Sequence, residues 1–408
     1  MNPAPGLLGL SIRQDHPDFL DLPWGLPLAR WAERTARIVQ VPRGLSRHEV
    51  VFVSYGAAIY AMKELPEHVA EREYETLRRL EERGLPAVLA VGSARVWTEG
   101  SEEAGGVLVT RFLDGSLPYR ALFRQAGLER YRDRLLDAMA SLIVRLHLGG
   151  CFWGDCSLSN TLFRRDAGEL QAFLVDAETS EVHESLSDGQ REQDLVVLEE
   201  NVAGDLADVS AESGGSMAPG AASEVVEAIR ARYQRLWGEI AREIVVAADE
   251  GYRIHERIRV LNDLGFSVDQ VELVAAGGGD HLRMRTIVTD RDYHRHQLHS
   301  LTGVVAGEEQ ARLMMQEIRE LRATLSRATR STPMSVAAFH WLDERFHPTL
   351  ERLAPLVTAD TDTLQLYCEV LEHKWYMSER AKRDVGLEVA VADYIEKFGK
   401  SASIALES

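Results

Sequence analysis

The sequence predicts an α+β protein with a small β-rich lobe, a larger helical lobe and a mostly helical α+β domain at its C-terminal end. Three observations lead to this prediction. Short apolar, β-rich runs dominate residues 37–112, interrupted by one helical pattern. Helical spacing of apolar residues dominates residues 113–250, and after Gly251 two strand patterns precede several helices. At 408 residues the chain is long enough for two or three domains, each with its own core.

The small lobe is expected over residues 37–112, after an N-terminal extension of residues 1–36. Its strands are expected at 37–41, 49–54, 57–63, around 87–91 and at 106–112. The second and third of these form a predicted hairpin that turns at Tyr55-Gly56 and ends at Lys63. A helix from Pro66 to Gly84 has apolar residues on one face and a dense charged face opposite. This lobe is therefore expected to consist mainly of strands, with one helix that begins shortly after Lys63.

The larger lobe is expected over residues 113–250. Its first long helix has apolar side chains at helical spacing and ends at Gly149-Gly150. Residues 178–212 hold eleven Asp or Glu against one Arg, which is more typical of a solvated face or mobile loop than of a substrate clamp. Frequent Gly, Ala and Ser predict a flexible loop near 203–223, and an amphipathic helix is expected from Glu224 to about Glu250.

Residues 251–408 form the predicted C-terminal domain, with a boundary near 250. Strands are expected at 268–274 and 281–289, on either side of Gly277-Gly278-Gly279, and helices at 293–301, 308–328, 336–353 and 363–383. Asp292, His296 and His299 are predicted to share a helical face that could bind zinc. Most surface helices rich in Asp and His bind nothing, so the alternative of an unoccupied polar face is favoured.

The overall charge limits the classes of partner. The chain carries 64 acidic and 46 basic side chains, a net charge of −18. Nucleic acids and anionic membranes attract clustered positive charge, so this balance argues against nonspecific binding to either. The N-terminus has no basic region ahead of an apolar one, which makes it a poor signal peptide. No apolar run approaches the ~20 residues that span a bilayer, so we expect no membrane span.

The cysteines point to a reducing compartment. Cys151, Cys156 and Cys368 form no Cys-x-x-Cys pair. An odd number without such a pair argues against a disulfide framework or a zinc cluster, and predicts a cytoplasmic location. We interpret Cys151 and Cys156 as small apolar core residues, as is usual for free cysteine.

The strongest indication of chemistry is the spacing of three polar residues. Asp155 is followed five residues later by Asn160, and Asp176 ends an apolar strand over 172–175. ATP-dependent phosphotransferases use this spacing: the first Asp orients or deprotonates the acceptor hydroxyl, while the Asn and the second Asp hold magnesium on the phosphates. Asp155 alone could be an Asp in a polar turn. The joint spacing favours the functional interpretation.

A phosphoryl-transfer site also needs a cation on the phosphates. Lys63 is the candidate, and a solvated lysine at a strand end is the alternative. A carboxylate from the following helix would orient it. That helix offers Glu71, Glu73 and Glu75, of which adjacent alternatives cannot point the same way. We select Glu73 and interpret the other two as surface charges.

Residues 37–200 resemble the lipopolysaccharide kinase (Kdo/WaaP) family of the protein-kinase-like superfamily, which includes aminoglycoside phosphotransferases. The matching segments are Tyr60-Ala-Met-Lys63, Arg72 to Leu80 followed by Gly84-Leu-Pro86, His147 to Asn160, Val175 to Glu178, and Gln190-Arg-Glu-Gln-Asp194-Leu. In that family an Asp placed like Asp194 helps to hold the catalytic loop. Residues 220–385 resemble an uncharacterised domain (DUF4032-like) that is fused to this unit in actinobacterial proteins.

The resemblance implies a bilobal protein-kinase-like fold that uses ATP and Mg²⁺. The roles it implies are catalytic base for Asp155, phosphate positioning for Lys63 and Glu73, nucleotide contact for Gly44, and metal binding for Asn160, Asp176 and Glu178. The family's glycine-rich loop is reduced here to Arg43-Gly44-Leu-Ser-Arg-His48. The second motif reads Asp-Ala-Glu, so an aromatic packing residue is absent at Ala177.

These observations together predict a cytoplasmic kinase that phosphorylates a hydroxyl of an unidentified acceptor, with a sugar or glycolipid among the candidates. The alternative, favoured by the reduced glycine loop, is a pseudokinase scaffold that binds nucleotide weakly or not at all and engages a protein partner through its C-terminal domain. A nucleic-acid-associated module using Arg283, Arg285 and Arg295 is a third alternative, which the net charge opposes.

Overall fold

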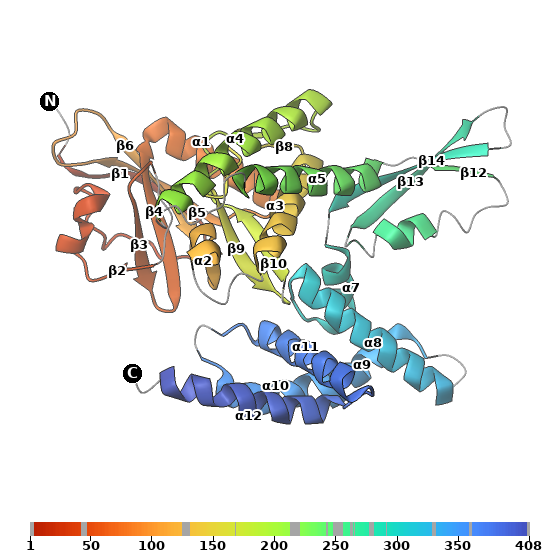
Figure 1. Cartoon of the computed structure of the whole chain (residues 1–408). Coiled ribbons are helices and arrows are strands. Elements are labelled where there is room, and N and C mark those ends of the chain that lie inside the picture. Colours follow the sequence, from red (N-terminus) through yellow and green to blue (C-terminus); the bar gives the residue numbers. More distant parts are fainter. Residues whose placement is uncertain are drawn as a thin grey trace. The chain divides into compact units, whose positions relative to one another are not determined.

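The computed structural model describes most of the chain. The described residues are 4–41, 47–124, 131–167, 169–212, 221–241, 244–247, 256–261, 264, 266–276, 281–290, 292–328, 332–358 and 361–405. The chain divides into two compact units (Figure 1). Unit 1 comprises Met1–Arg164 and Gln171–Gly238, and unit 2 comprises Arg165–Leu170 and Glu239–Ser408. The structure divides after Gly238, whereas the sequence predicted the boundary near residue 250.

The small lobe of unit 1 is a six-stranded antiparallel sheet. In spatial order its strands are β1 (Gly6–Ile12), β5 (Ala90–Trp97), β6 (Gly105–Arg111), β4 (Ala58–Pro66), β3 (Val50–Tyr55) and β2 (Ile38–Val39). β3 and β4 form the predicted hairpin, which turns at Gly56 with φ of 63°. β1 lies within the expected N-terminal extension and pairs with β5, so this extension adds an edge strand to the sheet.

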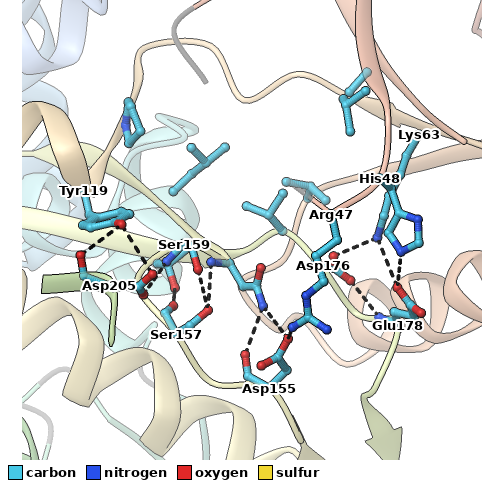
Figure 2. A pocket seen from close by; sticks show the side chains of 18 of the residues that line it. Arg47, His48, Lys63, Tyr119, Asp155, Ser157, Ser159, Asp176, Glu178 and Asp205 are labelled. Atoms are coloured by element: carbon cyan, nitrogen blue, oxygen red, sulfur yellow. Dashed lines mark hydrogen bonds and ion pairs between the residues drawn. The ribbon is translucent and has the colours of Figure 1, made fainter. Parts of the chain in front are cut away.

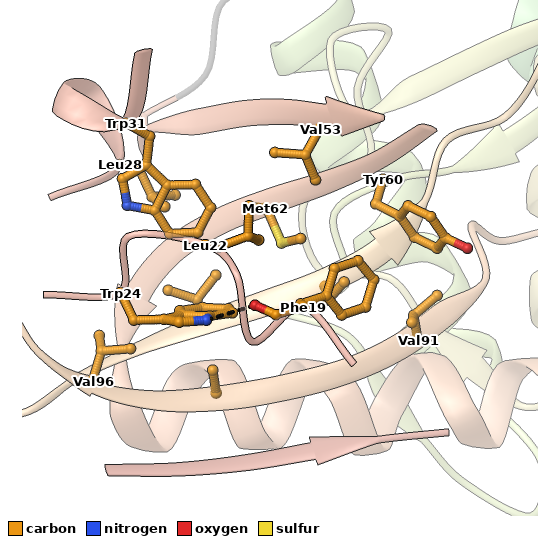
Figure 3. Packing of buried hydrophobic residues seen from close by; sticks show 13 residues of the cluster. Phe19, Leu22, Trp24, Leu28, Trp31, Val53, Tyr60, Met62, Val91 and Val96 are labelled. Carbon is orange, nitrogen blue, oxygen red and sulfur yellow. Dashed lines mark hydrogen bonds between the residues drawn. The ribbon is translucent and has the colours of Figure 1, made fainter. Parts of the chain in front are cut away.

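Different elements cover the two faces of this sheet. On one face an aromatic cluster that includes Trp24 and Trp31 packs against Met62 of β4 (Figure 3). On the other face α1 (Glu67–Glu82) approaches β6 so closely that a Cβ at Gly106 would overlap Ala70. Successive side chains of a strand alternate between faces. Lys63 therefore leaves the sheet on the face opposite Met62, toward α1.

The larger lobe combines helices with short strands. Its helices are α2 (Tyr119–Arg124), α3 (Tyr131–Leu148), α4 (Asp188–Glu212) and α5 (Ala221–Ala241). Its strands are β7 (Ser116–Pro118), β8 (Cys151–Phe152), β9 (Thr161–Asp166), β10 (Glu169–Leu174) and β11 (Glu181–Val182). β10, β9 and β7 form one sheet in that order, and β8 pairs with β11. Cys151 and Cys156 are buried and free, as interpreted from the sequence.

Two hydrogen bonds join the larger lobe to the chain that enters the sheet of the small lobe. The Leu174 N–H at the end of β10 donates to the Pro86 carbonyl, and the Val88 N–H donates to the Leu174 carbonyl, both at 2.9 Å. Residues 86–88 lie between α1 and β5. The strand that leads to Asp176 is thus tied to the small lobe at this point.

The prediction of a flexible loop near 203–223 is wrong for the first ten of these residues. Residues 203–212 continue α4, where Leu206 and Val209 are buried. The remaining residues, apart from the start of α5, lie outside the described part of the chain. Sequence composition misled here because small residues are tolerated in a helix whose apolar positions pack against a core.

Two further expectations for unit 1 are corrected. The acidic run is not a mobile loop, because residues 188–212 form α4 and its Asp194 is fully buried. The last helix ends at Ala241 instead of continuing to about Glu250. In addition, the strand expected around 87–91 begins at Ala90 and continues to Trp97.

Unit 2 contains a small antiparallel sheet and a group of helices. The sheet has the order β12 (Ile244–Ala247), β14 (His281–Asp290), β13 (Ser267–Ala276). The helices are α7 (Tyr293–Thr302), α8 (Glu308–Ala328), α9 (Met334–Trp341), α10 (His347–Leu353), α11 (Thr363–Ala381) and α12 (Leu387–Ala405), and a π-helical turn at Leu342–Phe346 joins α9 to α10. Both expected strands and all four expected helical segments are present, and α12 is additional. Gly277–Gly279 and the side chains of Arg283 and Arg285 lie outside the described part.

A hydrophobic core holds the helices of unit 2 together. It is centred on Trp341, Phe346 and Tyr367, each of which is buried. Glu317 is buried in this core and accepts hydrogen bonds from the Trp341 Nε1 at 2.9 Å and the Tyr367 hydroxyl at 2.6 Å. Among the described helices of either unit, none is long and apolar enough to cross a membrane. The cytoplasmic location stays a prediction.

Candidate functional site

A cavity of about 560 Å³ in unit 1 brings the predicted residues together (Figure 2). Its walls come from the sheet of the small lobe and from β9, α4 and the loops of the larger lobe. Its apolar lining includes Val50, Phe52, Ala61, Val88, Phe112, Leu113, Leu162 and Val175. Its polar lining includes Lys63, Asp155, Asn160, Asp176 and Glu178, five of the residues selected from the sequence.

Lys63 is held by carboxylates inside this cavity. Its Nζ lies 2.9 Å from Glu73 Oε2 on α1 and 2.8 Å from Asp176 Oδ2. The Lys63 side chain is only 12% exposed and that of Glu73 is fully buried, whereas Glu71 and Glu75 are exposed. The alternative of a solvated lysine is therefore wrong, and Glu73 is the residue of α1 that meets Lys63.

The local electrostatics reflect an excess of carboxylates. Burial and the Asp176 charge raise the pKa of Glu73 to about 7, although Lys63 acts in the opposite direction. Burial lowers the pKa of Lys63, but the charges of Glu73 and Asp176 outweigh it, so this pKa lies above its usual value. Glu178 is a third carboxylate near the same ammonium, at 3.9 Å. One lysine shared by three carboxylates leaves negative charge that a bound cation would offset.

Asp155 is oriented by three side chains. Its Oδ2 accepts hydrogen bonds from Asn160 Nδ2 at 3.0 Å and from Arg47 Nη2 at 2.9 Å. Its Oδ1 accepts from Asn201 Nδ2 at 2.8 Å. Asn201 lies on α4 and also donates to the Cys156 carbonyl at 3.2 Å. Both carboxylate oxygens of Asp155 thus have a fixed direction within the cavity.

The β9–β10 hairpin places Asn160 beside the segment that carries Asp176. Asn160 directly precedes β9, and Asp176 follows β10 by two residues. The Val175 N–H donates to the Asn160 carbonyl at 3.1 Å and closes the base of the hairpin. Beyond it, the Ala177 N–H donates to Glu73 Oε1 at 3.2 Å, and the Glu178 N–H donates to Asp176 Oδ1 at 3.1 Å. Residues sixteen positions apart in sequence are adjacent for this reason.

Asp194 of α4 holds the loop that contains Asp155. Its carboxylate accepts hydrogen bonds from the Trp153 and Gly154 N–H groups, each at 2.8 Å, and contacts His147 Nε2 at 3.2 Å. Gly154 has φ of 77°, and a Cβ there would lie 2.9 Å from the Thr179 carbonyl oxygen, so the position requires glycine. Burial lowers the pKa of His147. This arrangement matches the role that the resemblance implies for Asp194.

The described end of the reduced glycine loop contributes two basic side chains to the cavity. Arg47 reaches Asp155, and His48 Nε2 lies 3.1 Å from Glu178 Oε2. Gly44, which was predicted to contact the nucleotide, lies outside the described residues. Glu178, predicted as a further metal ligand, is here engaged with His48.

Sequence reasoning missed Arg47, Asn201 and Asp205 as residues of the cavity. Asp205 accepts a hydrogen bond from the Ser159 N–H at 3.0 Å, and burial raises its pKa. Asn201 and Asp205 are four residues apart and so share one face of α4. That spacing was visible in the sequence, but the acidic composition of the segment masked it.

The residues of the cavity fit a magnesium ion bound together with phosphate. Within the described residues no group of three or more His, Cys, Asp and Glu is arranged to hold a metal by itself. Mg²⁺ normally takes only one or two protein carboxylates, with waters and substrate phosphates completing its octahedron. Asp176 has a carboxylate and Asn160 an amide oxygen that could serve as such ligands. The uncompensated negative charge around Lys63 agrees with this donor set.

The three side chains of the second constellation that the sequence suggested differ in burial. Asp292 is buried at the start of α7, while His296 and His299 are exposed. The neighbouring His294 is buried and its Nδ1 lies 2.7 Å from Glu308 Oε1. Like the other His, Cys, Asp and Glu side chains of the described residues, these three are not arranged to hold a metal.

Comparison with known proteins divides the chain in two. Residues 57–213 match the family model of "Lipopolysaccharide kinase (Kdo/WaaP) family", and residues 235–398 match that of "Domain of unknown function (DUF4032)". No curated protein matches the chain. Both parts of the resemblance recognised in the sequence are confirmed by these matches, and the helices and strands of the structure confirm the α+β class of the fold.

The solved structures that are similar to the chain include the following two. WaaP in complex with acyl carrier protein is 16% identical, with a TM-score of 0.37, and the match covers 62% of this chain and 98% of that one. Aminoglycoside-3'-phosphotransferase of type VIII is 19% identical, with a TM-score of 0.35, and the match covers 55% of this chain and 95% of that one. The chain is thus similar over residues 57–213 to the lipopolysaccharide kinase (Kdo/WaaP) family, and over residues 235–398 to a domain of unknown function.

Proposed function

We propose that the chain is an ATP- and Mg²⁺-dependent kinase that transfers the γ-phosphoryl group to a hydroxyl of its acceptor. The observation that carries this proposal is the convergence of Lys63, Asp155, Asn160 and Asp176 on one cavity. These residues supply a cation for the phosphates, a carboxylate for the acceptor and two oxygen donors for a metal, which are the requirements of phosphoryl transfer. The match to a kinase family over residues 57–213 supports the same reaction class.

The cavity has one wall suited to the nucleotide base. Phe52, Ala61, Leu162 and Val175 line it with apolar side chains, between which a planar purine can be held. Lys63 then takes the phosphates, because Glu73 holds its ammonium in place from the buried side. In the proposed complex Lys63 donates to phosphate oxygens in place of its present bond to Asp176, which releases that carboxylate for the metal.

In this proposal Asp155 receives the proton of the acceptor hydroxyl. Asn160 and Asn201 fix its two oxygens, so that its orientation does not depend on the substrate. Magnesium, when bound by Asn160 and Asp176, would neutralise charge on the phosphates. Arg47 now occupies one oxygen of Asp155 and is 83% exposed, so a bound γ-phosphate can draw its guanidinium away.

The remaining wall supports an acceptor with several hydroxyl groups. Tyr119, Ser157, Ser159 and Asp205 line the cavity on the side of Asp155 away from Lys63 (Figure 2). Hydroxyl and carboxylate groups form hydrogen bonds with alcohols in both directions. We therefore favour a sugar or another polyol as the acceptor.

Calorimetric titration with ATP, with and without Mg²⁺, tests the proposal. We expect Mg²⁺ to strengthen ATP binding at least about tenfold in the wild type and to have little effect in Asp176→Ala, because a carboxylate ligand is lost. Asp188→Ala is the matched control, since that carboxylate is 96% exposed on α4 and outside the cavity. Absence of binding at millimolar ATP would instead support a pseudokinase scaffold.

The same preparation separates binding from chemistry. Asp155→Ala should bind Mg²⁺ and ATP as the wild type does, but should lose ATP hydrolysis by roughly 10²-fold or more, with water as the acceptor. Release of ADP measures this rate without knowledge of the natural acceptor. Equal hydrolysis by wild type and Asp155→Ala would exclude the assigned role.

A further inference from the structure

The β9–β10 hairpin belongs to both units of the chain. Its base lies in unit 1, where Asn160 precedes β9 and Asp176 follows β10. Its tip, residues 165–170, belongs to unit 2 together with the whole C-terminal domain. The two residues assigned to the metal are therefore carried by strands whose far ends are held by another part of the fold.

Asp166 anchors the tip. It is only 3% exposed, and its two oxygens accept hydrogen bonds from the first turn of α8: Oδ1 from the Gln310 N–H at 2.9 Å and Oδ2 from the Glu309 N–H at 3.2 Å. A carboxylate at this place satisfies two N–H groups and interacts favourably with the helix dipole. Any side chain at Gly307 would overlap the carboxylate, so glycine there permits the close approach.

Two neighbouring residues strengthen the anchor. The Ala167 N–H donates to Gln365 Oε1 on α11 at 2.7 Å, and Ala167 itself packs against the core around Trp341. Arg165 Nη1 lies 3.8 Å from Glu369 Oε1, also on α11. The tip is thus attached to two helices of the C-terminal domain and cannot shift independently of them.

The base of the hairpin responds to the position of its tip because the strands are short. β9 and β10 have six residues each and are hydrogen-bonded neighbours in one sheet, and the bond between the Val175 N–H and the Asn160 carbonyl lies at the end of the pair opposite the tip. Asn160 is further bound through its own N–H to Ser157 Oγ at 3.0 Å. A change of register or twist at the tip therefore alters the separation of Asn160 and Asp176.

We propose that Asp166 is a positioning residue for the Asn160–Asp176 pair, and that α8 of the C-terminal domain sets the geometry of the metal site through it. The assignment of that pair to a metal rests on the proposed function, whereas the coupling between tip and base does not. This gives residues 235–398, which match a domain of unknown function, a role in the kinase reaction itself.

Hydrogen–deuterium exchange of the full-length chain, read by mass spectrometry, tests the coupling. Asp166→Ala should speed exchange about tenfold in the peptide containing Val175 as well as at the tip, because the base bond opens more often. Asp166→Asn should have a smaller effect, since its carbonyl oxygen still accepts one of the two bonds. Glu308→Ala is the matched control: this buried carboxylate accepts the His294 and Arg295 N–H groups of α7 and forms no hydrogen bond or ion pair with the described residues of the hairpin.

Titration with Mg²⁺ at a fixed ATP concentration measures whether the coupling affects the proposed metal site. We expect Asp166→Ala to weaken the Mg²⁺-dependent step about tenfold while ATP binding without Mg²⁺ stays as in the wild type. Faster exchange at the tip with an unchanged base would overturn the inference, and so would an equal effect of Glu308→Ala on the base. If the wild type shows no Mg²⁺-dependent binding, the proposed function fails, and the exchange data still decide whether Asp166 positions the pair.

Discussion

Glu73 and Asp194 are both fully buried carboxylates next to the same cavity, yet their surroundings differ in kind. Glu73 is bound to the Lys63 ammonium and lies close to Asp176, so that its partners carry charge. Asp194 is bound to two backbone N–H groups and to His147. One carboxylate belongs to an ionic cluster that a ligand can rearrange, and the other to a hydrogen-bonded loop that must stay fixed.

The difference separates two tasks that a phosphotransfer site has to perform. Backbone donors cannot titrate or move away, so Asp194 gives the loop around Asp155 a single conformation. Burial raises the pKa of Glu73 to about 7, so its carboxylate can gain or lose a proton near neutral pH. Its interactions with Lys63 and Asp176 can therefore change when a charged ligand enters the cavity. Substitutions at these two positions should therefore fail in different ways.

The largest effect is expected for Asp194→Ala. It leaves the buried N–H of Trp153 and the partly buried N–H of Gly154 without their acceptor, so unfolding should require roughly 3–5 kcal/mol less free energy, and activity should be lost together with stability. Urea unfolding of Asp194→Ala and Asp194→Asn measures this, with the Asn variant losing less. A variant that keeps wild-type stability would show that the loop does not depend on these bonds.

A smaller, pH-dependent effect is expected for Glu73→Gln. The pKa of Glu73 is about 7 in the folded chain, compared with an ordinary value of 4.5. Between these two pH values the folded chain therefore binds more protons than the unfolded one. The stability that this group contributes is present at low pH and is lost as pH rises through that window. Relative to Glu73→Gln, the wild type should lose roughly 1–3 kcal/mol of unfolding free energy between pH 4.5 and pH 7.5.

Urea unfolding of both proteins across that pH range measures the difference. Lys63 stays protonated throughout, because its own pKa is raised, so it does not contribute to the slope. A difference between wild type and Glu73→Gln that does not change with pH would show that Glu73 is ionised over the whole range.

The smallest effect is expected for Asn201→Leu, which removes the amide donor to Asp155 Oδ1 without touching Lys63 or Glu73. Turnover of ATP should fall roughly threefold to tenfold because Asp155 loses one of its orienting bonds, while the KM for ATP stays constant. Val196→Ala, at an exposed position of the same helix, is the control. A change in KM with constant kcat would assign Asn201 to substrate binding instead.

Sequence patterns predicted best those features that depend on residues close together in the chain. Lys63 and Glu73 were found because the hairpin and the following helix are each visible as a local pattern, and the pairing between them needs only one tight turn. The spacing from Asp155 to Asn160 is likewise local. The same is true of α8, whose predicted bounds of 308–328 agree with the structure.

The residues that sequence reasoning missed depend on contacts between distant segments. Asn201 and Asp205 act on a loop more than forty positions earlier in the chain. Asp194 lies in an acidic run whose composition favours solvent, and only the resemblance pointed to it. The pairing of β1 with β5 joins residues 80 to 91 positions apart, and no periodicity in either segment predicts it.

The two hydrogen bonds between Leu174 and residues 86 and 88 also define how the cavity can open. If the small lobe moves while both hydrogen bonds stay formed, it rotates about an axis that passes through these two bonds. Asp176, two residues from it, moves little. Arg47 and His48 precede β3, three strands away across the sheet order β5-β6-β4-β3, and so travel furthest. Under the proposed function, nucleotide should therefore enter past Arg47 and meet Lys63 and Asp176, which are still joined at 2.8 Å before it binds.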